Sequence, residues 1–161
     1  MRKTILAFSL TMLSAMAQNL TPAQKEIDFR NLVATMNSWY APLDWKKELY
    51  GFDALQVRPW LDRVARTQTD LDFYELCVEY IAALKDTHSS YVLPSNFLAQ
   101  LGLTLDIYEG KVLIEGINRT LLPIASFPFV LGDEVVSLDG VEAEAWIQSL
   151  VKYVPQGNER A

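Results

Sequence analysis

Four residues in segment 84–94 are of the types that carry out serine-hydrolase chemistry. The segment reads LKDTHSSYVLP and holds the only histidine, His88, with Asp86 two residues before it and Ser89 and Ser90 directly after it. A serine hydroxyl is a weak nucleophile at neutral pH and needs a general base such as histidine, which an aspartate orients. The residue types therefore suit acyl transfer, and their spacing decides whether they can act together.

The spacing argues against a catalytic triad within this segment. In a strand, Asp86 and His88 point to one face and Ser89 to the other, whereas in a helix the three spread around the axis. Ser90 would share a strand face with Asp86 and His88, but no G-x-S-x-G turn is present to aim it. We therefore predict that none of them is catalytic here. His88 can instead lie at a helix end and donate a ring N–H to Asp86, or help to shape the cleft of a larger enzyme.

A helix with a strong start signal is predicted soon after residue 20. Thr21 suits the N-cap, Pro22 the first helical position, and Gln24 the third, where a capping box needs Glu or Gln. Apolar residues then recur at steps of three and four until Pro42, which bars continuation of the helix. This pattern predicts one buried stripe.

Three more helical patterns follow that helix, at 45–55, from 59 onward, and at 70–85, and the last of them runs into segment 84–94. The last is the clearest, with Thr69 or Asp70 as its cap and apolar residues in i, i+3, i+4 order. Cys77 lies on this apolar face, where we expect a small buried hydrophobe rather than a reactive thiol. Helices with one apolar face each predict a small bundle. With one cysteine and one histidine, a Cys/His metal site is excluded.

After Pro94 the apolar period changes from that of helices to that of strands. Strands are predicted at 101–108, 111–117 and 134–138, with turns at Glu109-Gly110, Gly132-Asp133 and Asp139-Gly140. A helix at 142–151 should point Ala143, Trp146, Ile147 and Leu150 inward. The predicted fold class is α+β, with a helical domain at 18–95 and a β-rich domain at 96–155.

Composition and the first residues indicate an exported protein. Residues 1–17 have a basic start, an apolar run shorter than the roughly 20 residues of a membrane span, and a small-x-small end. They predict a signal peptide that is cleaved between Ala17 and Gln18, with no membrane span after cleavage. A formal charge of −6 across 161 residues argues against nucleic acid or an anionic membrane surface as partner.

The β-rich half resembles a PDZ domain of the bacterial protease type. The resemblance rests on LGLTL at the start of a hairpin, followed by GDEVVSLDGVEAEAW. It implies that Leu101, Gly102, Leu103 and Thr104 form a loop whose backbone N–H groups bind the terminal carboxylate of protein or peptide tails, while the tail adds as a strand. An ordinary hairpin with two turns is the alternative interpretation.

Segment 84–94 adds to this resemblance. Its Leu84, Asp86, His88 and Ser89 match a Leu-x-Asp-x-His-(Ser/Thr) segment, and the chain is similar to the front of the tail-specific, or carboxyl-terminal-processing, serine peptidases and their tricorn-like relatives. The family uses a serine and a lysine or histidine base in an α/β domain after the PDZ domain, without a cofactor. We therefore expect residues 156–161 to begin a further domain, and no catalytic residue within these 161.

Three functional hypotheses follow. The first is the substrate-recruiting, amino-terminal portion of an exported serine endopeptidase, inactive by itself. The second is a non-enzymatic periplasmic binding or scaffold protein that captures carboxyl termini. The third is a small hydrolase centred on His88.

Overall fold

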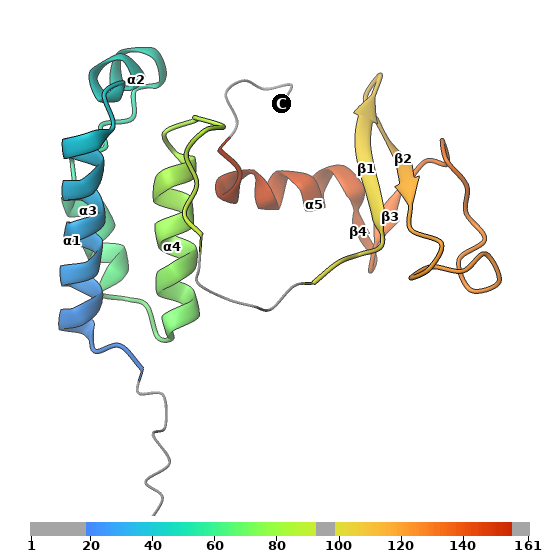
Figure 1. Cartoon of the computed structure of the whole chain (residues 1–161), viewed down its shortest axis with the longest axis horizontal. Coiled ribbons are helices and arrows are strands. Elements are labelled where there is room, and N and C mark those ends of the chain that lie inside the picture. The colour runs from blue at the N-terminus through green and yellow to red at the C-terminus, as the bar shows by residue number, and fades with distance from the viewer. Residues whose placement is uncertain (1–18, 93–98, 156–161) are drawn as a thin grey trace, which may run out of the picture.

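The computed structural model describes residues 19–92 and 99–155, which form a helical half and a half with short β-strands (Figure 1). The helical half contains α1 (Pro22–Trp39), α2 (Leu43–Tyr50), α3 (Arg58–Val64) and α4 (Asp70–Ala82). The second half contains β1 (Leu103–Tyr108), β2 (Lys111–Ile117), β3 (Ser137–Leu138), β4 (Val141–Glu142), α5 (Ala143–Leu150) and the short 3-10 helix η1 (Val151–Tyr153). The predicted α+β class is confirmed.

Several predicted features lie outside the described residues. These are the signal peptide at 1–17, its cleavage site, the boundary between 95 and 96, and the start of a further domain at 156–161. Within the part of the chain that is described, no helix has both the length and the apolar character needed to cross a membrane.

Capping boxes begin α1 and α4. The Gln24 N–H donates to the Thr21 hydroxyl at 3.3 Å, and the Gln24 side chain accepts from the Thr21 N–H at 2.9 Å. At α4, Thr69 and Asp72 exchange the same two bonds, at 3.1 and 2.9 Å. Each pair satisfies backbone donors that a helix start leaves free, so the predicted starts of both helices are confirmed.

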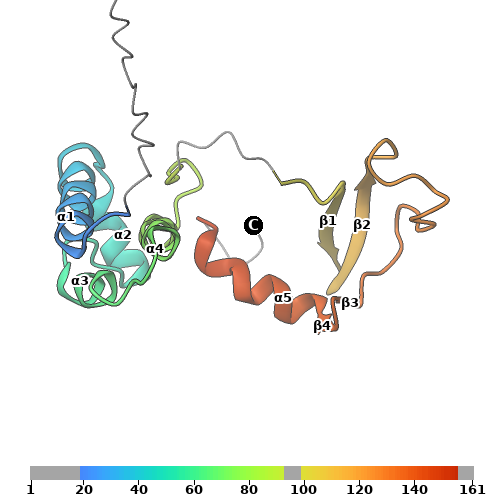
Figure 2. The same ribbon diagram turned by 90° about the horizontal axis from the view of Figure 1, so that it is seen from below.

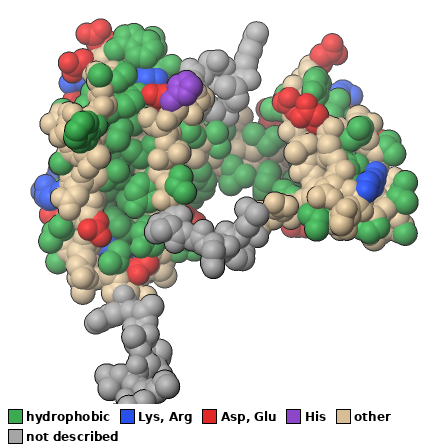
Figure 3. Space-filling view, in the orientation of Figure 1, with side chains coloured by type: hydrophobic (Ala, Val, Ile, Leu, Met, Phe, Trp, Pro, Cys, Tyr) green, Lys and Arg blue, Asp and Glu red, His purple; other side chains and the backbone are tan. Residues whose placement is uncertain are grey.

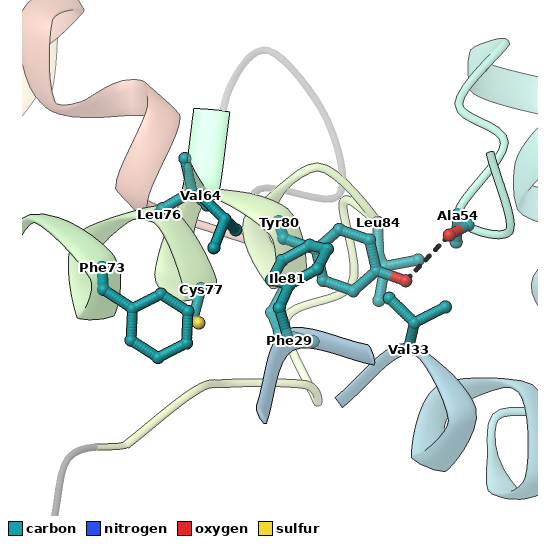
Figure 4. Close-up of a cluster of buried hydrophobic side chains, with 10 residues drawn as sticks. All are labelled: Phe29, Val33, Ala54, Val64, Phe73, Leu76, Cys77, Tyr80, Ile81 and Leu84. Carbon is teal, nitrogen blue, oxygen red and sulfur yellow. Dashed lines mark hydrogen bonds between the residues drawn. The ribbon is translucent and has the colours of Figure 1, made fainter. Parts of the chain in front are cut away.

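The main hydrophobic core lies between the helices of the first half (Figure 4). Tyr80 and Phe29 are fully buried, with ring centroids 5.1 Å apart and nearly perpendicular planes. The Tyr80 hydroxyl donates to the Ala54 carbonyl at 2.9 Å, which satisfies the one polar atom that this ring brings into the core. Cys77 is buried as predicted, and burial raises the pKa of its thiol to about 12.

Two helices end earlier than their apolar patterns indicated. Gly51 adopts a left-handed φ of 69° and ends α2 at Tyr50, so the predicted extension to residue 55 is wrong. Helix α4 ends at Ala82 rather than at Lys85, since Lys85 has a left-handed φ of 50°. Both ends are set by single left-handed residues, which an apolar period does not report.

The strands β1 and β2 form the predicted antiparallel hairpin, although β1 begins at Leu103 rather than at residue 101. Glu109 and Gly110 both have positive φ, 51° and 80°, as a two-residue type I′ turn requires. The register shifts between Thr104 and Leu105, where the pairing contains a bulge. Gly116 faces this bulge closely, because a Cβ there would lie 2.6 Å from the Thr104 hydroxyl.

A third segment lies along the other edge of β2. The Val135 N–H donates to the Val112 carbonyl at 2.8 Å, and the Ile114 N–H donates to the Asp133 carbonyl at 3.0 Å. Only one isolated bridge, Leu113 to Glu134, forms here. The predicted strand at 134–138 is therefore shorter than expected, and only its last two residues form β3, which pairs with β4 around the predicted Asp139-Gly140 turn.

The helix α5 connects the two halves (Figure 2). At its far end, the Lys152 ammonium of η1 lies 3.2 Å from the Glu79 carboxylate of α4, and the Tyr153 hydroxyl donates to Glu75 at 3.3 Å. Of the four residues predicted to point inward, only Ala143 is buried, whereas Trp146, Ile147 and Leu150 are half-buried. The inward stripe is thus only partly covered, because α5 lies between the halves rather than on a broad sheet.

Candidate functional site

Asp86, the acid of segment 84–94, is the centre of a turn. One carboxylate oxygen accepts the Tyr40 hydroxyl at 2.5 Å, and the other accepts the backbone N–H of His88 at 3.0 Å. The Asp86 carbonyl accepts the Ser89 N–H at 3.0 Å. Segment 86–89 is therefore neither a strand nor a helix, but a turn that the aspartate side chain closes on its own backbone.

The hydrogen bond to Tyr40 also determines the charge of this turn. It lowers the pKa of Asp86, with a smaller contribution from the His88 backbone N–H, because both bonds favour the carboxylate. The pKa of Tyr40 is raised, first by burial and then by the same bond to Asp86. The pair is therefore an ionised aspartate and a neutral phenol over the physiological pH range.

A buried lysine fixes the residue before this turn. The Lys46 ammonium donates to the Lys85 carbonyl at 2.8 Å and lies 5.1 and 5.2 Å from the ring centroids of Trp45 and Tyr50. Lys46 is only 6% exposed. Its hydrogen bond ties the end of α4 to α2, next to Leu84, which is fully buried. The apolar pattern of the first predicted helix includes Tyr40. No signal in the sequence marked Lys46 as a buried residue.

The single histidine is exposed on the surface (Figure 3). The expected ring hydrogen bond to Asp86 is not what the structure shows, since Asp86 accepts the backbone N–H of His88 instead. Ser89 is half-buried and Ser90 is exposed, and no hydrogen bond joins either hydroxyl to the imidazole within the described residues. The structure thus brings Asp86 and the His88 backbone together, but not the three side chains of a triad.

Only Leu101 and Gly102 of the predicted carboxylate loop precede β1, because Leu103 and Thr104 are paired with β2 as the first two residues of that strand. A shallow groove of about 520 Å³ lies beside these four residues. Its lining includes the four predicted residues Leu101, Gly102, Leu103 and Thr104, together with Gln100, Gly116, Ile117 and Asn118. Gly102 has a left-handed φ of 77°, and its carbonyl accepts the Asn118 N–H at 2.7 Å. A Cβ at Gly102 would lie 3.1 Å from the Leu122 side chain, so glycine suits both the backbone conformation and the packing.

The backbone of Leu103 faces away from β2. Because the bond between Gly102 and Asn118 flanks the facing pair Leu103 and Ile117, that pair is a non-hydrogen-bonded one. The N–H and C=O of Leu103 are therefore directed to the outer edge of β1. In the described ranges β1 pairs only with β2, which leaves this edge open to another strand.

Comparison with known proteins does not assign the chain to a family, since no family model matches it and no curated protein matches it. Among residues 19–92 and 99–155, no group of three His, Cys, Asp or Glu side chains could hold a metal ion. The candidate sites are therefore defined by their geometry alone: the turn at Asp86 and the groove at Gly102.

Proposed function

We propose that the second half of this chain captures the carboxyl-terminal tails of peptides or proteins in the groove at 101–104. The observation that carries the proposal is the open edge of β1, which begins directly after the left-handed Gly102. A tail that adds as a strand to β1 would accept from the Leu103 N–H and donate to its carbonyl, and its carboxylate would lie at the preceding loop. Leu101, with 65% of its surface exposed, is available to contact an apolar last residue.

We further propose that this groove recruits substrate for an exported serine-type endopeptidase, which hydrolyses peptide bonds with residues of a domain that follows the groove. The sequence supports this proposal through the order of its helices, the Leu84 to Ser89 motif and the GDEVVSLDG turn. The turn geometry fits it, because both carboxylate oxygens of Asp86 already accept hydrogen bonds that position the chain leaving α4. In this proposal Asp86 is a positioning residue that anchors the turn at 86–89, which follows α4.

The downstream reading frame distinguishes the peptidase from a non-enzymatic binding or scaffold protein. For a peptidase we expect an α/β domain with a serine at a strand-to-helix turn and a lysine or histidine base. A stop codon directly after Ala161 would contradict the peptidase and favour the scaffold.

Replacing Leu103 with proline tests the groove. Proline removes the outward N–H without removing a bond to β2, and the start of an edge strand tolerates it. With fluorescein-labelled peptides that end in valine, leucine or phenylalanine and carry a free carboxylate, we expect Leu103→Pro to weaken binding about tenfold, the value of one lost hydrogen bond. Fluorescence anisotropy measures the affinity.

Leu103→Ala is the matched control, because it trims the same side chain but keeps the N–H. We expect it to weaken binding less than Leu103→Pro, with similar melting curves by circular dichroism for both variants. Equal losses in the two variants would show that the side chain, and not an added strand, holds the peptide.

A further inference from the structure

A second cavity, of about 850 Å³, lies where the helical half faces the end of α5 and η1. Its walls come from the ends of α2 and α4, from α3, and from η1. The volume falls within the roughly 300–1,000 Å³ of pockets that bind small molecules, and such pockets favour the boundaries between structural units.

The cavity has apolar walls on both sides. Trp60 of α3 and Ala82 of α4 line the first side, and Val151 of η1 lines the other. Ala82 and its neighbour Ala83 are small, so α4 leaves room here that a larger side chain would fill. A flat or extended apolar group can therefore lie between α4 and η1.

The charged groups around the cavity are mostly positive. At one end, the Lys85 ammonium lies 5.0 Å from the Tyr50 ring centroid, and it forms no ion pair with a carboxylate of the described residues. At the other end, Lys152 pairs with Glu79, whose carboxylate also pairs with Arg63 outside the cavity lining. Among the residues that line the cavity, Lys85 and Lys152 are two cations to one acid, Glu79, on a chain whose net charge is −6.

Lys85 is the cation best placed to take up an anionic group. Its backbone is fixed, because its carbonyl accepts the Lys46 ammonium at 2.8 Å. Its side chain lines the cavity next to Tyr50, whereas Lys152 is already bound to Glu79 at 3.2 Å. A ligand with an anionic head at Lys85 would place its apolar body along Ala82 and Trp60.

We infer that the cavity between α4 and η1 binds small amphiphilic carboxylates, with the carboxylate at Lys85 and the hydrocarbon body against Trp60, Ala82 and Val151. A medium-chain fatty acid has this chemistry. The site is separate from the groove at 101–104 and does not depend on the proposed capture of peptide tails.

Isothermal titration of the full chain with decanoate, below its micellar concentration, tests this site. We expect decanoate to bind, and decanol, which lacks the charge, to bind about tenfold more weakly, as for the loss of one charge-assisted hydrogen bond. Lys85→Met should bring decanoate to the affinity of decanol, and Ala83→Phe should abolish binding of both by filling the cavity. Lys111→Met, which removes an exposed lysine of the hairpin that pairs with Glu134, is the matched control and should bind like the unaltered chain.

Three results would overturn the inference. These are no heat of binding with decanoate, equal affinities for decanoate and decanol, or a Lys85→Met variant that binds like Lys111→Met. In a further titration, a labelled peptide with a free carboxylate is tested for competition with decanoate. Competition between the two would assign the cavity to peptide capture instead. Thermal melts of each variant without ligand show whether the variant is folded, so that unfolding is not mistaken for a loss of affinity.

Discussion

Phe29→Ala should lower the free energy of unfolding by about 3–5 kcal/mol, the cost of removing a fully buried phenylalanine ring. Phe29 is 0% exposed, and its ring contacts those of Tyr80 and Trp60 at centroid distances of 5.1 and 6.2 Å. The cavity left behind would lie between α1, α3 and α4, the helices that make up most of the core. Urea denaturation followed by circular dichroism measures this effect.

Ile27→Ala is the matched control on the same helix. Ile27 is 58% exposed, so its truncation should change the free energy of unfolding by no more than about 0.5 kcal/mol. Phe29→Leu keeps most of the buried volume, so its loss in the free energy of unfolding should lie between those of Ile27→Ala and Phe29→Ala. This variant replaces Phe29→Ala in the comparison if the alanine variant does not fold. Similar losses for Ile27→Ala and Phe29→Ala would contradict the packing described for α1.

Asp86→Ala should destabilise the chain by about 1–2 kcal/mol, because it removes a half-exposed charged acceptor of two hydrogen bonds. Those bonds come from the Tyr40 hydroxyl and the His88 backbone N–H. His88→Asn should change stability by less than about 0.5 kcal/mol, since its imidazole is exposed and the backbone bond is kept. A large loss of stability with His88→Asn and no loss with Asp86→Ala would contradict these assignments.

The pH dependence of Asp86 has a definite sign. Its pKa is lowered in the folded chain, so its contribution to stability is complete above the unfolded value of about 3.9 and is lost as pH falls through the folded pKa. The stability difference between the unaltered chain and Asp86→Asn should therefore be constant near neutral pH and shrink in acid. Denaturation midpoints measured along a pH series would show this change, and a difference that grows in acid would contradict the assignment.

Local signals in the sequence predicted several elements well. The capping box at Thr21 and Gln24 and the Glu109-Gly110 turn are each set by residues within four positions of one another. Cys77 followed the strict apolar period of its helix and is buried. Such features depend on short-range hydrogen bonds and on backbone conformation, which sequence reports directly.

Contacts between distant residues could not be predicted in the same way. Asp86 was paired with the ring of His88 in the sequence interpretation, but its partner Tyr40 lies 46 residues earlier. Lys46 reaches the Lys85 carbonyl across a similar separation, and a buried lysine contradicts the ordinary preference of this residue for water. The predicted inward stripe of α5 is only partly buried for a related reason. A helical period shows which residues share a face, but not how much of the rest of the protein will cover that face.

The most direct test of peptide capture compares one peptide in two forms, with a free terminal carboxylate and as its amide. The groove beside Gly102 is proposed to hold the carboxylate at backbone N–H groups, so the free acid should bind the full chain at least about tenfold more tightly than the amide. Anisotropy titrations of the two labelled forms give both dissociation constants. Equal affinities would contradict the assignment of the terminal carboxylate to the loop that precedes β1.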